Sequence, residues 1–257
     1  MSKKTKYPQK DAEWLHHFDK EFGYKLIADP FQLDYVRNMI ASPSDVQAVI
    51  VDAAAGTGKT SLAVKTAHYL IEKGEYDELI YYRAPLSMHD QGFLGGTLEE
   101  KERPYMMPCV QALDEIQFEL AARMQRDGQL SLTTTTFERG MNRVGHKFVI
   151  VDEAQNFTLN ELRAVLTRFG DDAKIVIIGS TLQNDAPKKT NYGKFGLQPF
   201  TIFIRHLVDE ESDVSCKFCP LVNNYRGKFS QWADKVDETI KKIEKEIKEN
   251  VQHGRVS

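Results

Sequence analysis

Short apolar runs alternate with polar segments of helical periodicity between residues 46 and 178. We predict buried strands at residues 46–51, 79–82, 148–151 and 174–178. The last two runs are continuous, which is typical of parallel strands that are covered on both faces. Strands separated by helices predict an α/β fold, with helices on both faces of a mostly parallel sheet.

The segments around these runs extend the predicted organisation. A helix at residues 159–169 begins after Thr158, whose hydroxyl suits an N-cap position. The threonine run at 133–136 has high β propensity and would form a further strand. Residues 185–196 are rich in Lys, Asn, Gly and Pro, which predicts a loop.

The C-terminal segment has the pattern of a highly charged helix with a narrow apolar seam. The seam residues follow one another at helical spacing: Val236, Ile240, Ile243 and Ile247. We expect them to pack on the protein's own core; the alternative is a helix-to-helix contact with a neighbouring subunit. The predicted division is a lead-in at 1–28, one core domain at 29–227, and a charged helix and tail at 228–257.

The composition is that of a soluble globular protein. Of its 257 residues, 41% are hydrophobic and 28% are charged, which suits one domain with a full core. We find no apolar run long enough to span a bilayer, and the basic N-terminus lacks the apolar stretch of a secretory signal. We therefore expect a cytoplasmic protein that does not contact the membrane.

The net charge and the cysteines limit the candidate functions further. The net charge of −3 argues against a generally basic nucleic-acid binder but leaves room for a local basic stripe. Cys216 and Cys219 have the spacing of a metal or redox pair, and Cys109 is the third cysteine of the chain. A structural zinc site needs four ligands, so unpaired thiols are the better interpretation.

The residues after the first apolar run carry the first candidate chemistry. A strand, a glycine-containing loop and a helix beginning with Gly-Lys-Thr form the context of a phosphate-binding loop. Backbone N–H groups and the positive helix end would bind a polyphosphate. Lys59 would reach the β- and γ-phosphates, and Thr60 would bind Mg²⁺. The candidate binding residues are Ala53, Ala54, Ala55, Gly56, Thr57, Gly58, Lys59, Thr60 and Ser61.

The loop departs from the usual motif at its first position, where Ala53 replaces glycine. Glycine is favoured in such turns because it adopts positive φ without steric cost. Alanine would serve there if the turn keeps a negative φ.

Two further runs end in polar residues that suit phosphoryl chemistry. Asp152 and Glu153 follow the run at 148–151, where Asp152 would bind Mg²⁺ and Glu153 would orient or deprotonate water. Gln183 follows the run at 174–178 and would sense the γ-phosphate or position water.

Taken in order, these motifs resemble those of the PhoH family of ATPases, which is related to the core of superfamily 1 helicases. The resemblance covers about residues 29–226 and rests on Gln32, Tyr82–Pro85, Gly92–Gly96, Leu98–Lys101, Pro104–Tyr105, Asp152–Asn156 and Asn223–Arg226. The chain departs from the family pattern at Ala53, Ala84, Gly95 and Ser180. It is identified as a divergent member.

The resemblance implies a P-loop NTPase of the RecA-like type, a three-layer sandwich that binds ATP and Mg²⁺. Gln32 would read adenine, and Arg226 would contact the γ-phosphate. It also implies a homo-oligomer, for which a hexameric ring is one form. The stretch after Gln183 is too short for a second nucleotide-fold domain. We therefore expect the site to be completed by a tail folded back in cis or by a neighbouring subunit in trans.

A nucleic-acid surface is the next hypothesis. Basic side chains near the ends of the predicted strands are interleaved with aromatic ones, which suits single-stranded RNA or DNA. The residues are Arg83, Lys188, Lys189 and Lys194, with Tyr81, Tyr82, Tyr192 and Phe195. A solvated loop is the alternative for this segment.

The sequence thus favours a Mg²⁺-dependent ATPase with a helicase-like core coupled to RNA or single-stranded DNA. The alternatives are an ATPase that acts on a protein partner and a nucleotide-binding module with weak turnover. A phosphotransferase is less favoured, because Glu153 beside Asp152 suits attack by water.

Overall fold

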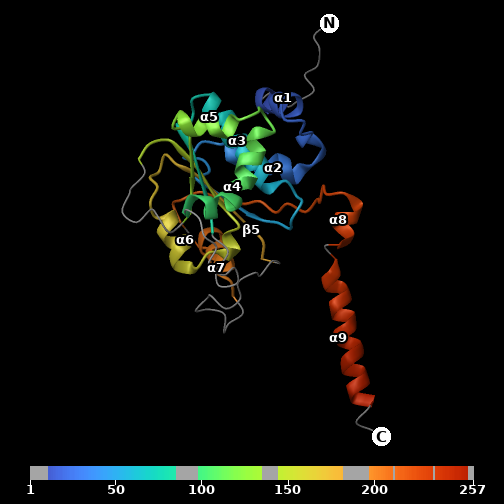
Figure 1. The fold of residues 1–257 in the computed structure, drawn as a ribbon. Helices are drawn as coiled ribbons and strands as arrows, with labels where there is room; N and C mark the ends of the chain where they lie inside the picture. Colours follow the sequence, from blue (N-terminus) through green and yellow to red (C-terminus); the bar gives the residue numbers. More distant parts are fainter. Residues whose placement is uncertain are drawn as a thin grey trace.

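The computed structural model describes residues 11–84, 98–134, 144–181, 197–210, 212–233 and 235–253 (Figure 1). Its centre is a parallel sheet in the order β3-β2-β4-β5-β1-β6, which has six strands within the described residues. The strands are β1 (Ala48–Asp52), β2 (Glu78–Arg83), β3 (Leu130–Thr133), β4 (Lys147–Asp152), β5 (Lys174–Gly179) and β6 (Cys216–Phe218). Strand β5 lies between β1 and β4 and pairs with both.

Helices cover both faces of the sheet, so the molecule has three layers (Figure 1). One face packs against α1 (Ala12–Lys20), α2 (Pro30–Ile40), α3 (Lys59–Glu72), α4 (Leu98–Asp114) and α5 (Leu120–Arg126). The other packs against α6 (Leu159–Leu166) and α7 (Pro199–Val208). Short 3₁₀ turns lie at η2 (Leu26–Ala28) and η4 (Ala154–Asn156). The expected three-layer α/β fold with a parallel sheet is confirmed.

The continuous apolar runs follow from this layering. In β4, Phe148 and Ile150 belong to the core beneath α1–α5, whereas Val149 and Val151 belong to the core beneath α6 and α7. Successive side chains of a strand point to opposite faces, so a strand covered on both sides needs apolar residues at every position.

The strands at the two edges differ from what the sequence predicts. The four predicted strands are confirmed, but β3 covers Leu130–Thr133, so the strand proposed at 133–136 was placed too far along the chain. Thr135 and Thr136 lie outside the described residues. The prediction missed β6, because three residues beginning with Cys216 are too few to give a periodic signal.

Helix α6 begins as predicted and ends earlier. Thr158 accepts a hydrogen bond from the backbone N–H of Glu161, and the Glu161 side chain accepts from the backbone N–H of Thr158. This reciprocal capping box satisfies two backbone donors at the start of the helix. The helix ends at Leu166, three residues before the predicted end at 169.

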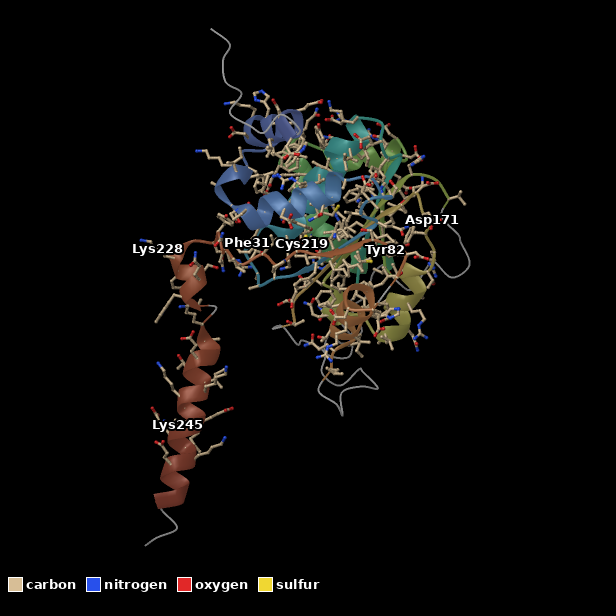
Figure 2. All side chains as sticks on the ribbon, turned by 180° about the vertical axis from the view of Figure 1, so that it is seen from behind. Phe31, Tyr82, Asp171, Cys219, Lys228 and Lys245 are labelled. Atoms are coloured by element: carbon tan, nitrogen blue, oxygen red, sulfur yellow. The ribbon has the colours of Figure 1, made fainter. Side chains whose placement is uncertain are left out.

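The C-terminal helices form an arm that projects from the sandwich: α8 (Lys228–Ala233) and α9 (Val236–His253) (Figure 1). Figure 2 shows Lys245 of α9 well apart from the body of the molecule. The seam residues of α9 are 46–57% exposed. The expectation that this seam packs on the protein's own core was therefore wrong, since the seam indicates an apolar face but not what covers it.

Two other expectations concern the membrane and the cysteines. No helix in the described residues is long and apolar enough to cross a bilayer. Cys109, Cys216 and Cys219 are all free thiols, and Cys109 and Cys219 are buried. The predicted loop at 185–196 lies outside the described residues, and the domain limits at 29 and 227 stay a prediction.

Candidate active site

The loop after β1 is the candidate phosphate-binding loop, and two of its glycines adopt a backbone conformation that other residues rarely adopt. Gly56 and Gly58 both have a φ of +84°, in the left-handed region that favours glycine. Ala53 has no positive φ, because Glu119 and Glu153 alone have one among the described non-glycine residues. Its N–H instead donates to the carbonyl of Gly179 at 3.1 Å. Ala53 thus extends the pairing of β1 with β5, and glycine is not needed there.

The start of α3 brings the loop lysine and threonine to the end of β4. Lys59 is buried, and its Nζ lies 3.4 Å from the carbonyl oxygen of Ala54. The hydroxyl of Thr60 lies 3.2 Å from each carboxylate oxygen of Asp152, which is 1% exposed. Magnesium prefers such hard oxygen ligands and is typically held by one or two carboxylates plus substrate phosphates. The donor set of Thr60 and Asp152 therefore fits magnesium.

Several groups surround the Asp152 carboxylate. The hydroxyl of Tyr81 donates to Asp152 Oδ2 at 2.6 Å, and the backbone N–H of Glu153 donates to Oδ1 at 3.0 Å. Burial raises the pKa of Asp152, and the hydrogen bond from Tyr81 and the charge of Arg83 oppose this rise. Removing a buried carboxylate from water disfavours its charged form, so cations beside it are stabilising.

Glu153 is fixed by a strained backbone and by a side-chain network. Its φ of +54° places it in the left-handed region, where a side chain is uncommon. Gln155 donates from Nε2 to Glu153 Oε2 at 2.6 Å, and Gln155 Oε1 accepts from the N–H of Ser180 at 3.1 Å. This chain of hydrogen bonds ties the candidate base at the end of β4 to the end of β5.

Gln32 contacts the loop from α2. The Asp29 side chain caps this helix by accepting from the N–H groups of Phe31 and Gln32, at 2.9 and 3.3 Å. The side-chain amide of Gln32 donates to the carbonyl of Thr57 at 3.0 Å. Gln32 therefore lies at the nucleotide loop, and its adenine-reading role stays a prediction.

Residues 223–227, which we call the strap, cross the loop from the C-terminal side. The N–H of Tyr225 donates to the carbonyl of Gly56 at 2.8 Å, and the Tyr225 hydroxyl donates to Asp29. A Cβ at Gly56 would lie 2.5 Å from Asn224 Oδ1 and 2.6 Å from Arg226 Cγ. The side chain of Arg226 thus lies over the candidate phosphate-binding loop of its own chain.

The base of the strap is held by α8. Gln231 donates from Nε2 to the carbonyl of Asn224 at 3.2 Å and to that of Arg226 at 2.6 Å. Because both acceptors belong to the strap backbone, α8 fixes its course beside the loop.

The structure corrects the predicted nucleic-acid surface. Tyr81 and Tyr82 are completely buried, so neither ring can stack on a base, and Figure 2 shows Tyr82 within the body of the molecule. Arg83 faces the carboxylates of Asp152 and Glu153. The remaining residues of the predicted nucleic-acid surface lie outside the described residues: Lys188, Lys189, Lys194, Tyr192 and Phe195. The same holds for Gln183, the predicted γ-phosphate sensor.

The sequence interpretation missed the roles of two residues that shape the site: it placed Tyr81 on a nucleic-acid surface and named Gln155 only as part of the family motif at 152–156. Tyr81 lies two positions before Arg83 in β2, and Arg83 is opposite Asp152 in the strand register. The two-residue period of a strand puts Tyr81 and Arg83 on the same face, which would have indicated Tyr81 as a partner of Asp152. Gln155 lies in the turn directly after Glu153, and its polar side chain beside the acidic pair was the available signal.

Comparisons with known proteins agree on one family. The family model described as PhoH-like protein matches residues 28–214. A PhoH-like protein of Synechocystis is 39% identical over 146 residues, which cover 56% of this chain and 43% of the relative. A PhoH-like protein of Bacillus subtilis is 36% identical over 141 residues, covering 54% and 44%. Protein PhoH of Escherichia coli is 32% identical over 147 residues, covering 55% and 41%.

The chain spans less than half the length of these curated relatives. Among solved structures, the HK97 bacteriophage large terminase is similar with a TM-score of 0.44 and 15% identity, over 74% of this chain and 39% of that one.

Proposed function

The chain belongs to the PhoH-like protein family, and from this premise we propose that it is a magnesium-dependent ATPase. The resemblance of its motifs to those of superfamily 1 helicases supports single-stranded RNA or DNA as the target to which hydrolysis is coupled. The observation that carries the proposal is the approach of Thr60, at the end of the phosphate-binding loop, to within 3.2 Å of Asp152. This contact joins a phosphate site to a buried carboxylate, as ATP hydrolysis requires.

The loop would bind the phosphates of ATP. Its N–H groups and the N-terminus of α3 present positive charge, and Lys59 would leave the carbonyl of Ala54 for the β- and γ-phosphates. Thr60 and Asp152 would hold Mg²⁺, which when bound neutralises charge on the phosphate oxygens. Gln32 would read the base from its position beside Thr57.

Glu153 would take a proton from the attacking water. Its Oε2 is held by Gln155, so the carboxylate has a fixed orientation at the carboxyl end of β4. Arg226 would neutralise the negative charge that develops on the γ-phosphate, and its place over Gly56 supports action in cis. Gln183 would assist in sensing the γ-phosphate.

A protein partner is the second candidate target of the ATPase. The observation in its favour is a stripe of large apolar side chains along the arm, all at least 46% exposed: Phe229, Trp232, Val236, Ile240, Ile243 and Ile247. Exposed apolar surface of this extent is typical of protein interfaces, including those between copies of one chain. A homo-oligomer formed through the arm belongs to this proposal.

Steady-state phosphate release from ATP tests the proposal, with and without magnesium and with and without single-stranded RNA or DNA. The Lys59→Ala variant is the control for hydrolysis at this site. Stimulation by nucleic acid that disappears in the variant supports the first candidate. Lys59-dependent hydrolysis that is indifferent to nucleic acid favours the protein partner, and the absence of Lys59-dependent hydrolysis contradicts the ATPase.

A further inference from the structure

The guanidinium of Arg83 lies between the two acidic side chains of the candidate site. Its Nη1 is 3.7 Å from Asp152 Oδ2, and its Nη2 is 3.7 Å from Glu153 Oε1. The pairing of β2 with β4 sets Arg83 opposite Asp152, so the sheet itself fixes this placement. Arg83 is 21% exposed at its side chain, whereas Asp152 is almost completely buried.

The two carboxylates also have shorter contacts, one of which is made by Asp152 Oδ2, the oxygen that Arg83 faces. Asp152 Oδ1 and Oδ2 receive the N–H of Glu153 and the hydroxyl of Tyr81, and Glu153 Oε2 receives the amide of Gln155. Within the described residues, Glu153 Oε1 is contacted by Arg83. Arg83 therefore faces the oxygen of Glu153 that Gln155 does not contact.

The two contacts of Arg83 are electrostatic. At 3.7 Å they exceed the range of about 2.7–3.2 Å for N–H···O hydrogen bonds, so they hold the guanidinium by charge. Because one guanidinium makes both contacts, a cation that displaces it from Asp152 also withdraws it from Glu153.

We infer that Arg83 is a positioning residue that acts as the resident counter-cation of Asp152 and Glu153, and that a magnesium ion bound at this site would displace it from both carboxylates. This inference rests on the proposed function. A magnesium ion held by Thr60 and Asp152 would carry two positive charges into a buried site that Arg83 also faces, and like charges repel strongly there.

The binding of Mn²⁺ in the absence of nucleotide tests this exchange directly. Electron paramagnetic resonance of free Mn²⁺ gives its affinity for the wild-type protein and for Arg83→Gln. We expect the variant to bind Mn²⁺ about tenfold more tightly, because the carboxylates lose their competing cation. Arg37→Gln is the matched control, since Arg37 pairs with Asp11 at 2.8 Å outside the site, and it should bind as the wild type does.

Arg83→Lys keeps the charge and refines the test. A lysine ammonium is compact and cannot reach both carboxylates at once, so we expect an affinity about threefold above that of the wild type. If Arg83→Gln does not fold, the increase in the Mn²⁺ affinity of Arg83→Lys tests the inference on its own. Affinities equal to that of the wild type, including no detectable binding by any of the proteins, would overturn the inference.

The result is separable from the proposed function. Mn²⁺ binding needs no ATP, so a wild-type protein without ATPase activity would contradict the proposed function and leave the comparison of affinities informative. Conversely, an active wild type in which Arg83→Gln does not alter Mn²⁺ binding would overturn the role of Arg83 alone.

Discussion

Gly56 is the residue at which the phosphate-binding loop and the strap meet. In Gly56→Ala, the new methyl group would lie 2.5 Å from Asn224 Oδ1 and would displace the strap, besides requiring an unfavourable φ of +84°. We expect the rate of ATP hydrolysis to fall about a hundredfold, because a shift of about 1 Å at a catalytic group has costs of this order. Steady-state phosphate release measures the effect.

Gly74→Ala is the matched control for this substitution. Gly74 has a similar φ of +73°, and a Cβ there would meet nothing within 4 Å. It carries the backbone strain without the contact with the strap. Equal activity in the two variants would show that the approach of the strap to Gly56 does not contribute to hydrolysis.

The buried side chain of Lys174 predicts that the stability of the protein depends on pH. Burial lowers its pKa to about 7, against the opposing charge of Asp45, and its Nζ donates to the carbonyls of Val46 and Asn38. Between about pH 7 and pH 10.5 the unfolded chain binds a proton at Lys174 that the folded chain lacks, so the free energy of unfolding rises with pH.

The variant Lys174→Met should lack this rise. We expect the difference in free energy of unfolding between wild type and variant to increase with pH from about 7, with a limiting slope of about 1.4 kcal/mol per pH unit. Urea unfolding at several pH values measures it. A constant difference for Lys174→Met would contradict a lowered pKa.

The roles of single residues could be predicted only where a local pattern determines them. The place of Lys59 and Thr60 at the start of a helix was predicted from their spacing after a strand, and their roles stay predictions. Tyr81 and Tyr82 were misassigned because an aromatic residue beside an arginine looks the same in a nucleic-acid surface and in a strand buried on both faces. Their burial depends on α1–α7, which the local sequence does not reveal.

At the scale of elements, periodicity predicted the interior strands, whereas the strap was expected only from the family resemblance, as one of two ways to complete the site. A strand covered on both faces leaves a continuous apolar run, whereas β6 is three residues long and leaves none. The strap meets Gly56 across a long stretch of chain. Its contacts are a backbone hydrogen bond and the close approach of Asn224 and Arg226, for which sequence periodicity gives no signal.

The strap allows the choice between cis and trans completion of the site to be tested. We mix Lys59→Ala protein with Arg226→Ala protein and measure phosphate release. Because Arg226 lies over the loop of its own chain, we expect no recovery of activity at any ratio. In a trans arrangement, a subunit with intact Lys59 would receive Arg226 from its neighbour, so partial recovery would contradict action in cis.

At the scale of the whole molecule, the nucleotide loop and the projecting arm are connected by a short path. Strand β6 pairs with β1 at the edge of the sheet, the strap then crosses the loop, and α8 and α9 follow. Gln231 joins α8 to the strap through two carbonyls. A partner that binds the apolar side chains of the arm would therefore bind next to the strap, the segment that contacts Gly56.

Two truncations separate the arm from the strap that it continues. Ending the chain after Ala233 removes α9, whose described side chains are exposed, so we expect the melting temperature to change by less than about 2 °C and ATP hydrolysis without a partner to persist.

Ending the chain after Gly227 also removes Gln231, which releases the carbonyls of Asn224 and Arg226 and loosens Arg226 over the loop. We expect hydrolysis to fall at least about tenfold in this shorter chain, since a correctly placed arginine contributes more than that to phosphoryl transfer. Phosphate release by the two truncated proteins tests the role of α8, since equal rates would show that α8 does not position the strap. Calorimetry tests the role of α9, since a large loss of stability in the chain that ends after Ala233 would show that α9 packs on the body of the molecule.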